Sequence, residues 1–157
     1  MDIQTTFSIV NSRADIQDGR VNILNCTEDE LKVELTKPTE DAGKAALSAL
    51  EKALQDYREG VFDVLVTAPI NKHTIQSDTF HFPGHTEYIE ERVGKGEKAL
   101  MILLKNDFRV ALVTGHIPVS EISRTLTKEL IMEKMAIFHR SLKQDFGIDS
   151  PRIAVLS

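Results

Sequence analysis

The stretch FDVLVTA (residues 62–68) decides the fold class of this chain. Its apolar residues fall on both faces of an extended segment, whereas a half-buried strand alternates apolar and polar residues. A strand of this kind suits the middle of a sheet that helices cover on both sides, because there neither face meets water. We therefore expect an α/β protein in which this strand runs directly into the loop PINKH (69–73).

The residues before this strand predict three short strands and one long helix. The helix should run from Glu40 to Arg58, because Thr39 can cap it and Gly60 can end it. One apolar stripe follows the helical period, formed by Ala46, Leu50, Ala53, Leu54 and Tyr57. The predicted strands are TFSIV (6–10), RVNIL (20–24) and LKVEL (31–35).

The residues after FDVLVTA predict a short helical turn at 74–76 and a helix from Thr86 to Val93, with the Thr86 hydroxyl as its N-terminal cap. A hairpin should follow, with the strands ALMILLK (99–105) and FRVALVT (108–114) joined by Asn106 and Asp107.

The last part of the chain predicts two helices and a second buried strand. The helices cover 121–125 and 128–146, and the longer one carries an apolar face and stops at Gly147. That face consists of Ile131, Met135, Phe138, Leu142 and Phe146, and the strand is PRIAVLS (151–157). Crossover helices combined with one hairpin predict a single domain over 1–157, built as a three-layer α/β/α sandwich with a mixed sheet.

Composition excludes several classes of protein. The 157 residues are 41% hydrophobic and 27% charged with a formal net charge of -5, so there is no basic excess to hold nucleic acid. No apolar run approaches the roughly 20 residues that span a bilayer, and the N-terminus does not resemble a signal peptide. Cys26 is the one cysteine, which excludes an internal disulfide and favours a cytoplasmic location.

The candidate chemistry lies in three loops that each follow a predicted strand or precede a predicted helix. They are TAPINK (67–72), FPGHTE (82–87) and TGHIP (114–118). In FPGHTE the glycine lets a ligand approach the backbone, His85 can donate to an anion, and Thr86 stands where a helix N-terminus offers free N–H groups. These features suit a phosphate. The alternative is that Pro83-Gly84 is only a turn, with Thr86 a cap and His85 a solvated loop residue.

Two further residues are candidates at the ends of predicted strands. His116 follows FRVALVT between Gly115 and Pro118 and is a candidate ligand; the alternative is a loop histidine bonded to the backbone. Lys72 can meet a substrate anion, or it is a solvated surface lysine. The other histidines, His73, His81 and His139, are interpreted as surface or structural residues, since no pair has the spacing of a zinc site.

Taken in order, TAPINKH, FPGHTEYIEER (82–92), ALVTGHIPVSEIS (111–123) and DFGIDSPRIAVLS (145–157) resemble the 4-hydroxythreonine-4-phosphate dehydrogenase family of bacterial vitamin B6 biosynthesis. The resemblance is clear from about residue 40 onward and weaker before it. It implies a fold similar to isocitrate and isopropylmalate dehydrogenases, and it makes the chain the central part of a longer two-domain protein, with both flanking portions absent.

The resemblance also implies an activity and roles for residues. The activity is the oxidation of 4-phosphohydroxy-L-threonine by NAD or NADP, followed by decarboxylation to 3-amino-2-oxopropyl phosphate in a homodimer. His85 and Thr86 match the substrate-binding pair, Lys72 matches a lysine of the PINK-like loop, and His116 matches one of three histidines that hold a divalent metal such as Zn, Mg or Co. The metal acts as a Lewis acid on the substrate oxygen.

The same resemblance predicts that this chain is inactive alone, because a segment of the type Leu-Asn-Pro-His-Ala-Gly, with the second metal histidine, is expected after Ser157. Two alternatives remain open. The chain could belong to a relative that acts on another hydroxy acid phosphate or on a diol, or it could be a non-catalytic module that binds ligands or dimerises.

Overall fold

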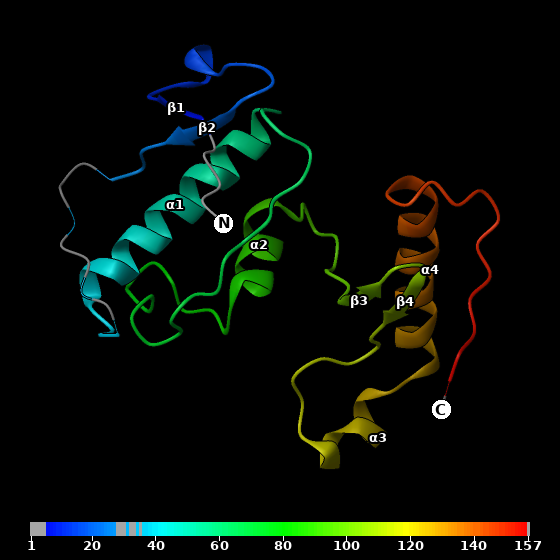
Figure 1. Ribbon diagram of the computed structural model, residues 1–157. Coiled ribbons are helices and arrows are strands. Elements are labelled where there is room, and N and C mark those ends of the chain that lie inside the picture. Colours follow the sequence, from blue (N-terminus) through cyan, green and yellow to red (C-terminus); the bar gives the residue numbers. More distant parts are fainter. Residues whose placement is uncertain (1–5, 28–30, 32–33, 35, 157) are drawn as a thin grey trace. The chain divides into compact units, whose positions relative to one another are not determined.

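The computed structural model describes residues 6–27, 31, 34 and 36–156. Contacts divide the chain into two compact units, Met1–Glu97 and Lys98–Ser157. In the first unit the α1 helix is the central element, with a small sheet against one side of it and the α2 helix against another (Figure 1). The second unit combines a β-hairpin with the long helix α4.

The small sheet of the first unit contains two of the three strands expected there. Strands β1 (Phe7–Val10) and β2 (Val21–Leu24) pair in parallel, and the 3-10 turn η1 (Arg13–Asp15) lies in their connection. Asp15 Oδ2 accepts hydrogen bonds from the backbone N–H of Ser12 at 3.0 Å and from its hydroxyl at 2.9 Å, which closes the turn. Of the third expected strand, LKVEL, Leu31 and Glu34 have no regular secondary structure and the other residues lie outside those described.

The helix α1 (Glu40–Arg58) begins and ends where the sequence predicts. The hydroxyl of Thr39 accepts a hydrogen bond from the Ala42 N–H at 3.2 Å, and Gly60 leaves the helix with a φ of 69°. Its buried face differs from the expected stripe, because Tyr57 is 44% exposed; its ring centre lies 6.1 Å from that of Phe62. The buried residues are Gly43, Leu47, Leu50 and Leu54.

The core of the first unit forms where α1 meets α2 and the loop before it. The helix α2 spans His85–Val93, and the core joins Leu47, Leu50 and Leu54 to Ile75, Phe80 and Tyr88. The expected helical turn before α2 is present as one turn closed by the Ile75 N–H and the Asn71 carbonyl at 3.2 Å. The prediction of Thr86 as N-terminal cap is wrong, because the cap position is occupied by Gly84.

The stretch FDVLVTA is not a buried strand within this chain. Residues 64–70 are without hydrogen-bonded strand structure, and Val66 is 88% exposed. A strand requires a neighbouring strand to accept and donate its backbone hydrogen bonds. The two sheets of the described residues are β1–β2 and β3–β4, and neither includes this stretch.

The second unit opens with the predicted hairpin. Strands β3 (Ile102–Lys105) and β4 (Phe108–Ala111) pair antiparallel, with Ile102 opposite Ala111 and Lys105 opposite Phe108. The two-residue connection requires a left-handed backbone, and Asn106 supplies it with a φ of 53°.

After the hairpin the chain is helical, as the sequence predicts. The 3-10 turn η2 (Val119–Glu121) leads into the short helix α3 (Ile122–Thr125). The long helix α4 (Lys128–Gln144) follows, and its first turn is capped by the Thr127 hydroxyl, which accepts from the Leu130 N–H at 3.1 Å. Phe138 and Leu142 on the expected apolar face are buried.

The final stretch, PRIAVLS, also has no strand partner among the described residues. Residues 151–156 do not form a strand, and Leu156 is 89% exposed. Between this segment, β4 and α4 lies a cavity of about 540 Å³ with largely apolar walls, which include Val110, Phe138 and Ile153. The Arg109 guanidinium lies 4.7 Å from the Phe146 ring centre, and its buried Nε has no hydrogen-bond partner among the described residues.

These elements make the chain an α/β protein. The expected mixed sheet is not formed by the residues that the structure describes, because one pair of strands is parallel, the other is antiparallel, and the two sheets are separate. Among the helices of these residues, none has both the length and the apolar character needed to cross a bilayer.

Candidate functional site

Two of the three candidate loops belong to the first unit and one to the second. Lys72 lies in the turn before α2, and His85 and Thr86 form the first two residues of α2. His116 lies in the second unit, in the segment between β4 and η2.

The loop that carries Lys72 is held in shape by Asn71. The Asn71 side-chain oxygen accepts hydrogen bonds from the backbone N–H of His73 at 3.0 Å and of Thr74 at 3.2 Å. This Asx turn bends the chain immediately after the exposed segment. Gly43 of α1 then lies against the same turn, since an idealised Cβ on Gly43 would stand 1.8 Å from the Thr74 carbonyl oxygen. The turn can approach α1 this closely because Gly43 has no side chain.

The FPGHTE loop delivers His85 and Thr86 at the N-terminus of α2. Gly84 is extended, with φ -177° and ψ -167°, and its carbonyl accepts from the Tyr88 N–H at 3.4 Å. The first N–H groups of a helix have no carbonyl partner within the helix, and they lie at its positive end. His85 is half-buried and Thr86 is exposed, so both border this positive end from the solvent side.

Lys72 reaches the same place from the neighbouring turn. An idealised Cβ on Gly84 would stand 4.0 Å from Cε of Lys72 and 3.6 Å from a carboxylate oxygen of Glu87. The structure therefore brings the Lys72 side chain alongside the backbone that immediately precedes His85 and Thr86. An ammonium group, an imidazole, a hydroxyl and helix N–H groups are the donors with which proteins bind phosphate.

An aromatic cluster joins this loop to α2. The Tyr88 ring is 0% exposed and packs against Phe80 at 4.8 Å and Phe82 at 5.2 Å between ring centres. The Tyr88 hydroxyl donates to Glu51 of α1 at 3.0 Å. Burial and this hydrogen bond raise the pKa of Tyr88.

Sequence reasoning did not single out Asn71, Gly43, Tyr88 or Glu51. Asn71 could have been found, because an asparagine whose side chain can accept from backbone N–H groups a few residues later is a known turn signal. The contact between Glu51 and Tyr88 joins residues on different helices, so no local pattern indicates it.

His116 stands at the centre of a tight turn, closed by a hydrogen bond from the Ile117 N–H to the Gly115 carbonyl at 2.9 Å. His116 is exposed in this turn. Among the described residues, no three His, Cys, Asp or Glu side chains lie together in a way that could hold a metal ion. A catalytic metal takes about three protein ligands, so these residues alone do not fit the metal that the resemblance implies.

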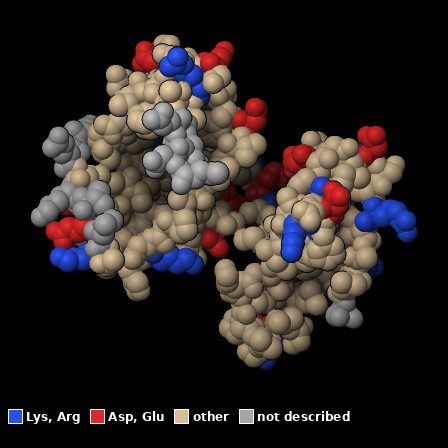
Figure 2. Space-filling view, in the orientation of Figure 1, with Lys and Arg blue, Asp and Glu red and all other residues tan. Residues whose placement is uncertain are grey.

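The remaining histidines, His73, His81 and His139, are exposed, which confirms their interpretation as surface residues. Figure 2 shows acidic and basic side chains interspersed on its visible face, without a broad basic patch.

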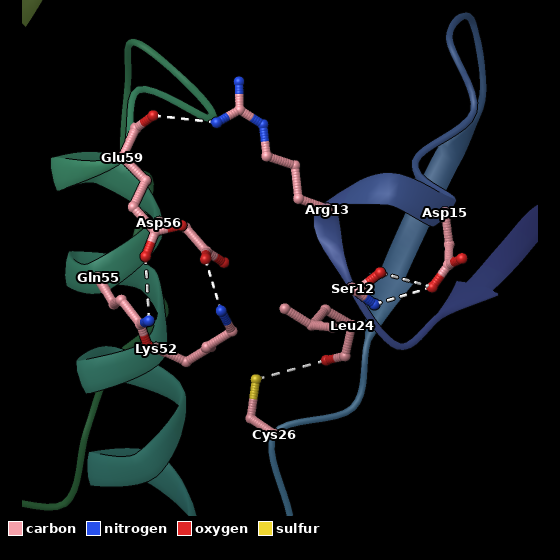
Figure 3. Close-up of polar contacts among 9 residues, drawn as sticks. All are labelled: Ser12, Arg13, Asp15, Leu24, Cys26, Lys52, Gln55, Asp56 and Glu59. Atoms are coloured by element: carbon pink, nitrogen blue, oxygen red, sulfur yellow. Dashed lines mark hydrogen bonds and ion pairs between the residues drawn. The ribbon is translucent and has the colours of Figure 1, made fainter.

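A second set of polar contacts lies between α1 and the segment that carries Cys26 (Figure 3). Lys52 and Asp56 form an ion pair at 2.6 Å, and the Cys26 thiol lies 3.5 Å from the Leu24 carbonyl oxygen. Burial and the Asp56 charge raise the pKa of Cys26, while Lys52 lowers it by less. Arg13 donates to the Glu59 carbonyl at 3.1 Å and so joins the η1 turn to the end of α1.

Comparisons with known proteins extend the likeness to the whole chain. It is 68% identical to the 4-hydroxythreonine-4-phosphate dehydrogenase of Bacteroides thetaiotaomicron, over 100% of this chain and 43% of that protein. The enzyme of the same name from Sulfurihydrogenibium sp. is 35% identical over 94% of this chain and 45% of its own length. The chain therefore spans less than half the length of these relatives.

A solved structure shares the fold. The crystal structure of 4-hydroxythreonine-4-phosphate dehydrogenase from Klebsiella pneumoniae matches with a TM-score of 0.78 at 23% identity, over 94% of this chain and 46% of that one. The family described as pyridoxal phosphate biosynthetic protein PdxA matches residues 1–157, and the chain belongs to this family.

Proposed function

We propose that this chain supplies the phosphate-binding part, and one metal ligand, of a 4-hydroxythreonine-4-phosphate dehydrogenase. The reaction is the oxidation of 4-phosphohydroxy-L-threonine by NAD or NADP, with decarboxylation to 3-amino-2-oxopropyl phosphate. One observation carries the proposal: the Lys72 side chain lies beside Gly84, at the helix end that presents His85 and Thr86.

Each residue has a distinct part in binding the substrate phosphate. The N-terminus of α2 offers backbone N–H groups and the positive end of the helix dipole. The Thr86 hydroxyl and the His85 imidazole add side-chain hydrogen bonds, and Lys72 adds a full positive charge. Holding the phosphate at this point orients the rest of the substrate, which is how binding far from the reacting carbon contributes to rate.

His116 is proposed as one ligand of a divalent metal such as Zn, Mg or Co. Its exposed imidazole in a rigid turn suits that role. Because the described residues provide no complete ligand set, the remaining ligands are proposed to come from polypeptide other than these residues.

A three-layer sandwich with a mixed sheet, similar to isocitrate and isopropylmalate dehydrogenases, is proposed for the longer proteins of the family. The exposed apolar side chains of Val64, Val66, Val155 and Leu156 support it, because such residues are normally covered in a strand of a sheet. We further propose that the chain forms one domain of a two-domain protein, that the protein is a homodimer, and that it acts in the cytoplasm, where a lone cysteine is common.

The experiment uses a full-length chimera, in which this chain replaces the matching 157 residues of the Bacteroides thetaiotaomicron relative. NADH or NADPH formation from 4-phosphohydroxy-L-threonine is followed by absorbance. We expect turnover by the chimera and its loss on His116→Ala. A chimera that folds but does not turn over this substrate, when the parent enzyme does, would contradict the proposal.

A further inference from the structure

We propose that Tyr88 is a positioning residue for phosphate binding, and that it acts through its hydrogen bond to Glu51. The inference rests on the proposed function of the FPGHTE loop. It concerns how the first turn of α2, with His85 and Thr86, is held relative to the turn that carries Lys72.

The Tyr88 side chain is held by contacts of its ring and by a hydrogen bond of its hydroxyl. Its ring is fully buried between Phe80 and Phe82, and Arg92 lies over it at 5.1 Å from the ring centre. Its hydroxyl donates to Glu51 Oε1 at 3.0 Å. The acceptor is a carboxylate on a different helix, so the bond joins α2 to α1.

The helix α1 is the common support of both parts of the phosphate site. Near its N-terminal end Gly43 contacts the turn of residues 72–75, and two turns later Glu51 binds Tyr88. These two residues are eight positions apart, which is about 12 Å along a helix axis. Two contacts with one helix therefore help to hold Lys72 in place relative to His85 and Thr86.

The hydrogen bond supplies a preferred direction, which the apolar contacts lack. Burial of aromatic surface stabilises the cluster but has no direction, so it permits α2 to rotate or slide slightly. A hydrogen bond is directional, and one to a carboxylate is stronger than one between neutral groups. Tyr88 lies in the first turn of α2 with His85 and Thr86, so a fixed position of its hydroxyl helps to orient the backbone from which those side chains extend.

The chimera described above provides the test, with KM for 4-phosphohydroxy-L-threonine and kcat measured separately. Tyr88→Phe keeps the ring and its packing but removes the hydroxyl. We expect KM to rise about tenfold with kcat changed less than about twofold, which is the result of losing binding common to ground state and transition state. Tyr57 is the one other tyrosine of the chain and is partly exposed on α1, so Tyr57→Phe is the matched control and should leave both constants unchanged.

Changes at Glu51 separate positioning from stability. Glu51→Gln keeps an acceptor oxygen for the Tyr88 hydroxyl and should hold KM within about threefold of the unmodified chimera. Glu51→Ala should raise KM as Tyr88→Phe does, and the double variant should raise it no further, because both changes delete the same bond.

The outcomes are distinguishable. An unmodified chimera without activity would overturn the proposed function itself. An active chimera in which Tyr88→Phe lowers the melting temperature but leaves KM unchanged would overturn the positioning role, as would additive effects of Tyr88→Phe and Glu51→Ala.

Discussion

Gly43 is the residue that allows α1 to approach the turn carrying Lys72. An added Cβ would stand 1.8 Å from the Thr74 carbonyl oxygen, and a backbone atom of a closed turn cannot move aside cheaply. Gly43→Ala should therefore lower the free energy of unfolding by about 2 kcal/mol. The energetic cost of this overlap exceeds the roughly 1 kcal/mol by which alanine is favoured over glycine inside a helix. Urea unfolding of the chain measures it.

The matched control is Lys44→Ala, at the next position of α1, where the side chain is exposed. This change should alter the free energy of unfolding by less than about 0.5 kcal/mol. A Gly43→Ala variant as stable as the Lys44→Ala variant would show that the turn does not depend on this close contact.

Cys26 gives a prediction about pH. Its raised pKa means that less thiolate is present at pH 8 than in a free cysteine, so iodoacetamide should alkylate it more slowly in the folded chain than in urea. Because Asp56 raises this pKa and Lys52 lowers it, Asp56→Asn should speed alkylation and Lys52→Met should slow it further. Slower alkylation of the Asp56→Asn variant, or faster alkylation of the Lys52→Met variant, would contradict the assigned causes.

At the scale of elements, the three threonines near helix starts have different roles. Thr39 and Thr127 accept hydrogen bonds from the first turns of α1 and α4. Thr86 is instead the second residue of α2, and Gly84 holds the cap position. Thr39→Ala and Thr127→Ala should each lower the free energy of unfolding by about 1 kcal/mol, and Thr86→Ala should lower it much less. Thermal or urea unfolding of the three variants measures this.

Thr86→Ala should instead raise KM for the phosphorylated substrate in the chimera. If it destabilised the protein as much as the two caps do, without affecting KM, Thr86 would be a structural residue only.

Helices were predicted more accurately than strands, for a physical reason. The signals that start and stop α1 and α4, such as Thr39, Thr127 and Gly147, act within a few residues, so the sequence reveals them. The hairpin is also local, since its strands are adjacent in the chain. FDVLVTA and PRIAVLS have the composition of buried strands, but a strand forms only beside a partner, and the described residues provide none for either.

In the candidate site, too, local features could be predicted from the sequence and contacts between distant elements could not. The positions of His85 at a helix start and of Lys72 in a turn could be predicted from local patterns. The support beneath them could not, because Gly43, Glu51 and Tyr88 act across elements that are separated in the sequence.

At the scale of the whole molecule, exposed apolar side chains are the feature that the proposed full-length fold would cover. Val64, Val66, Phe108 and Leu156 are all more exposed than is usual for large apolar residues in a sheet protein. The isolated chain should therefore enhance the fluorescence of the dye ANS, and the chimera should do so much less. Equal fluorescence from both proteins would contradict the proposal that these side chains are covered at full length.

The isolated chain should also be inactive. It spans 43% of the Bacteroides thetaiotaomicron relative, and His116 is one ligand where a catalytic metal takes about three. We expect no NADH formation from 4-phosphohydroxy-L-threonine with added Zn, Mg or Co. Turnover by the purified 157-residue chain would contradict this expectation.

The most direct test of the phosphate site compares two histidines of one loop in the chimera. His85 borders the α2 N-terminus, whereas His81 is exposed four residues earlier. The account predicts that His85→Asn lowers kcat/KM for 4-phosphohydroxy-L-threonine by about a hundredfold, equivalent to about 2.7 kcal/mol of transition-state binding, and that His81→Asn changes it by less than about twofold. Equal effects of the two substitutions would contradict the assignment of the FPGHTE loop to the substrate phosphate.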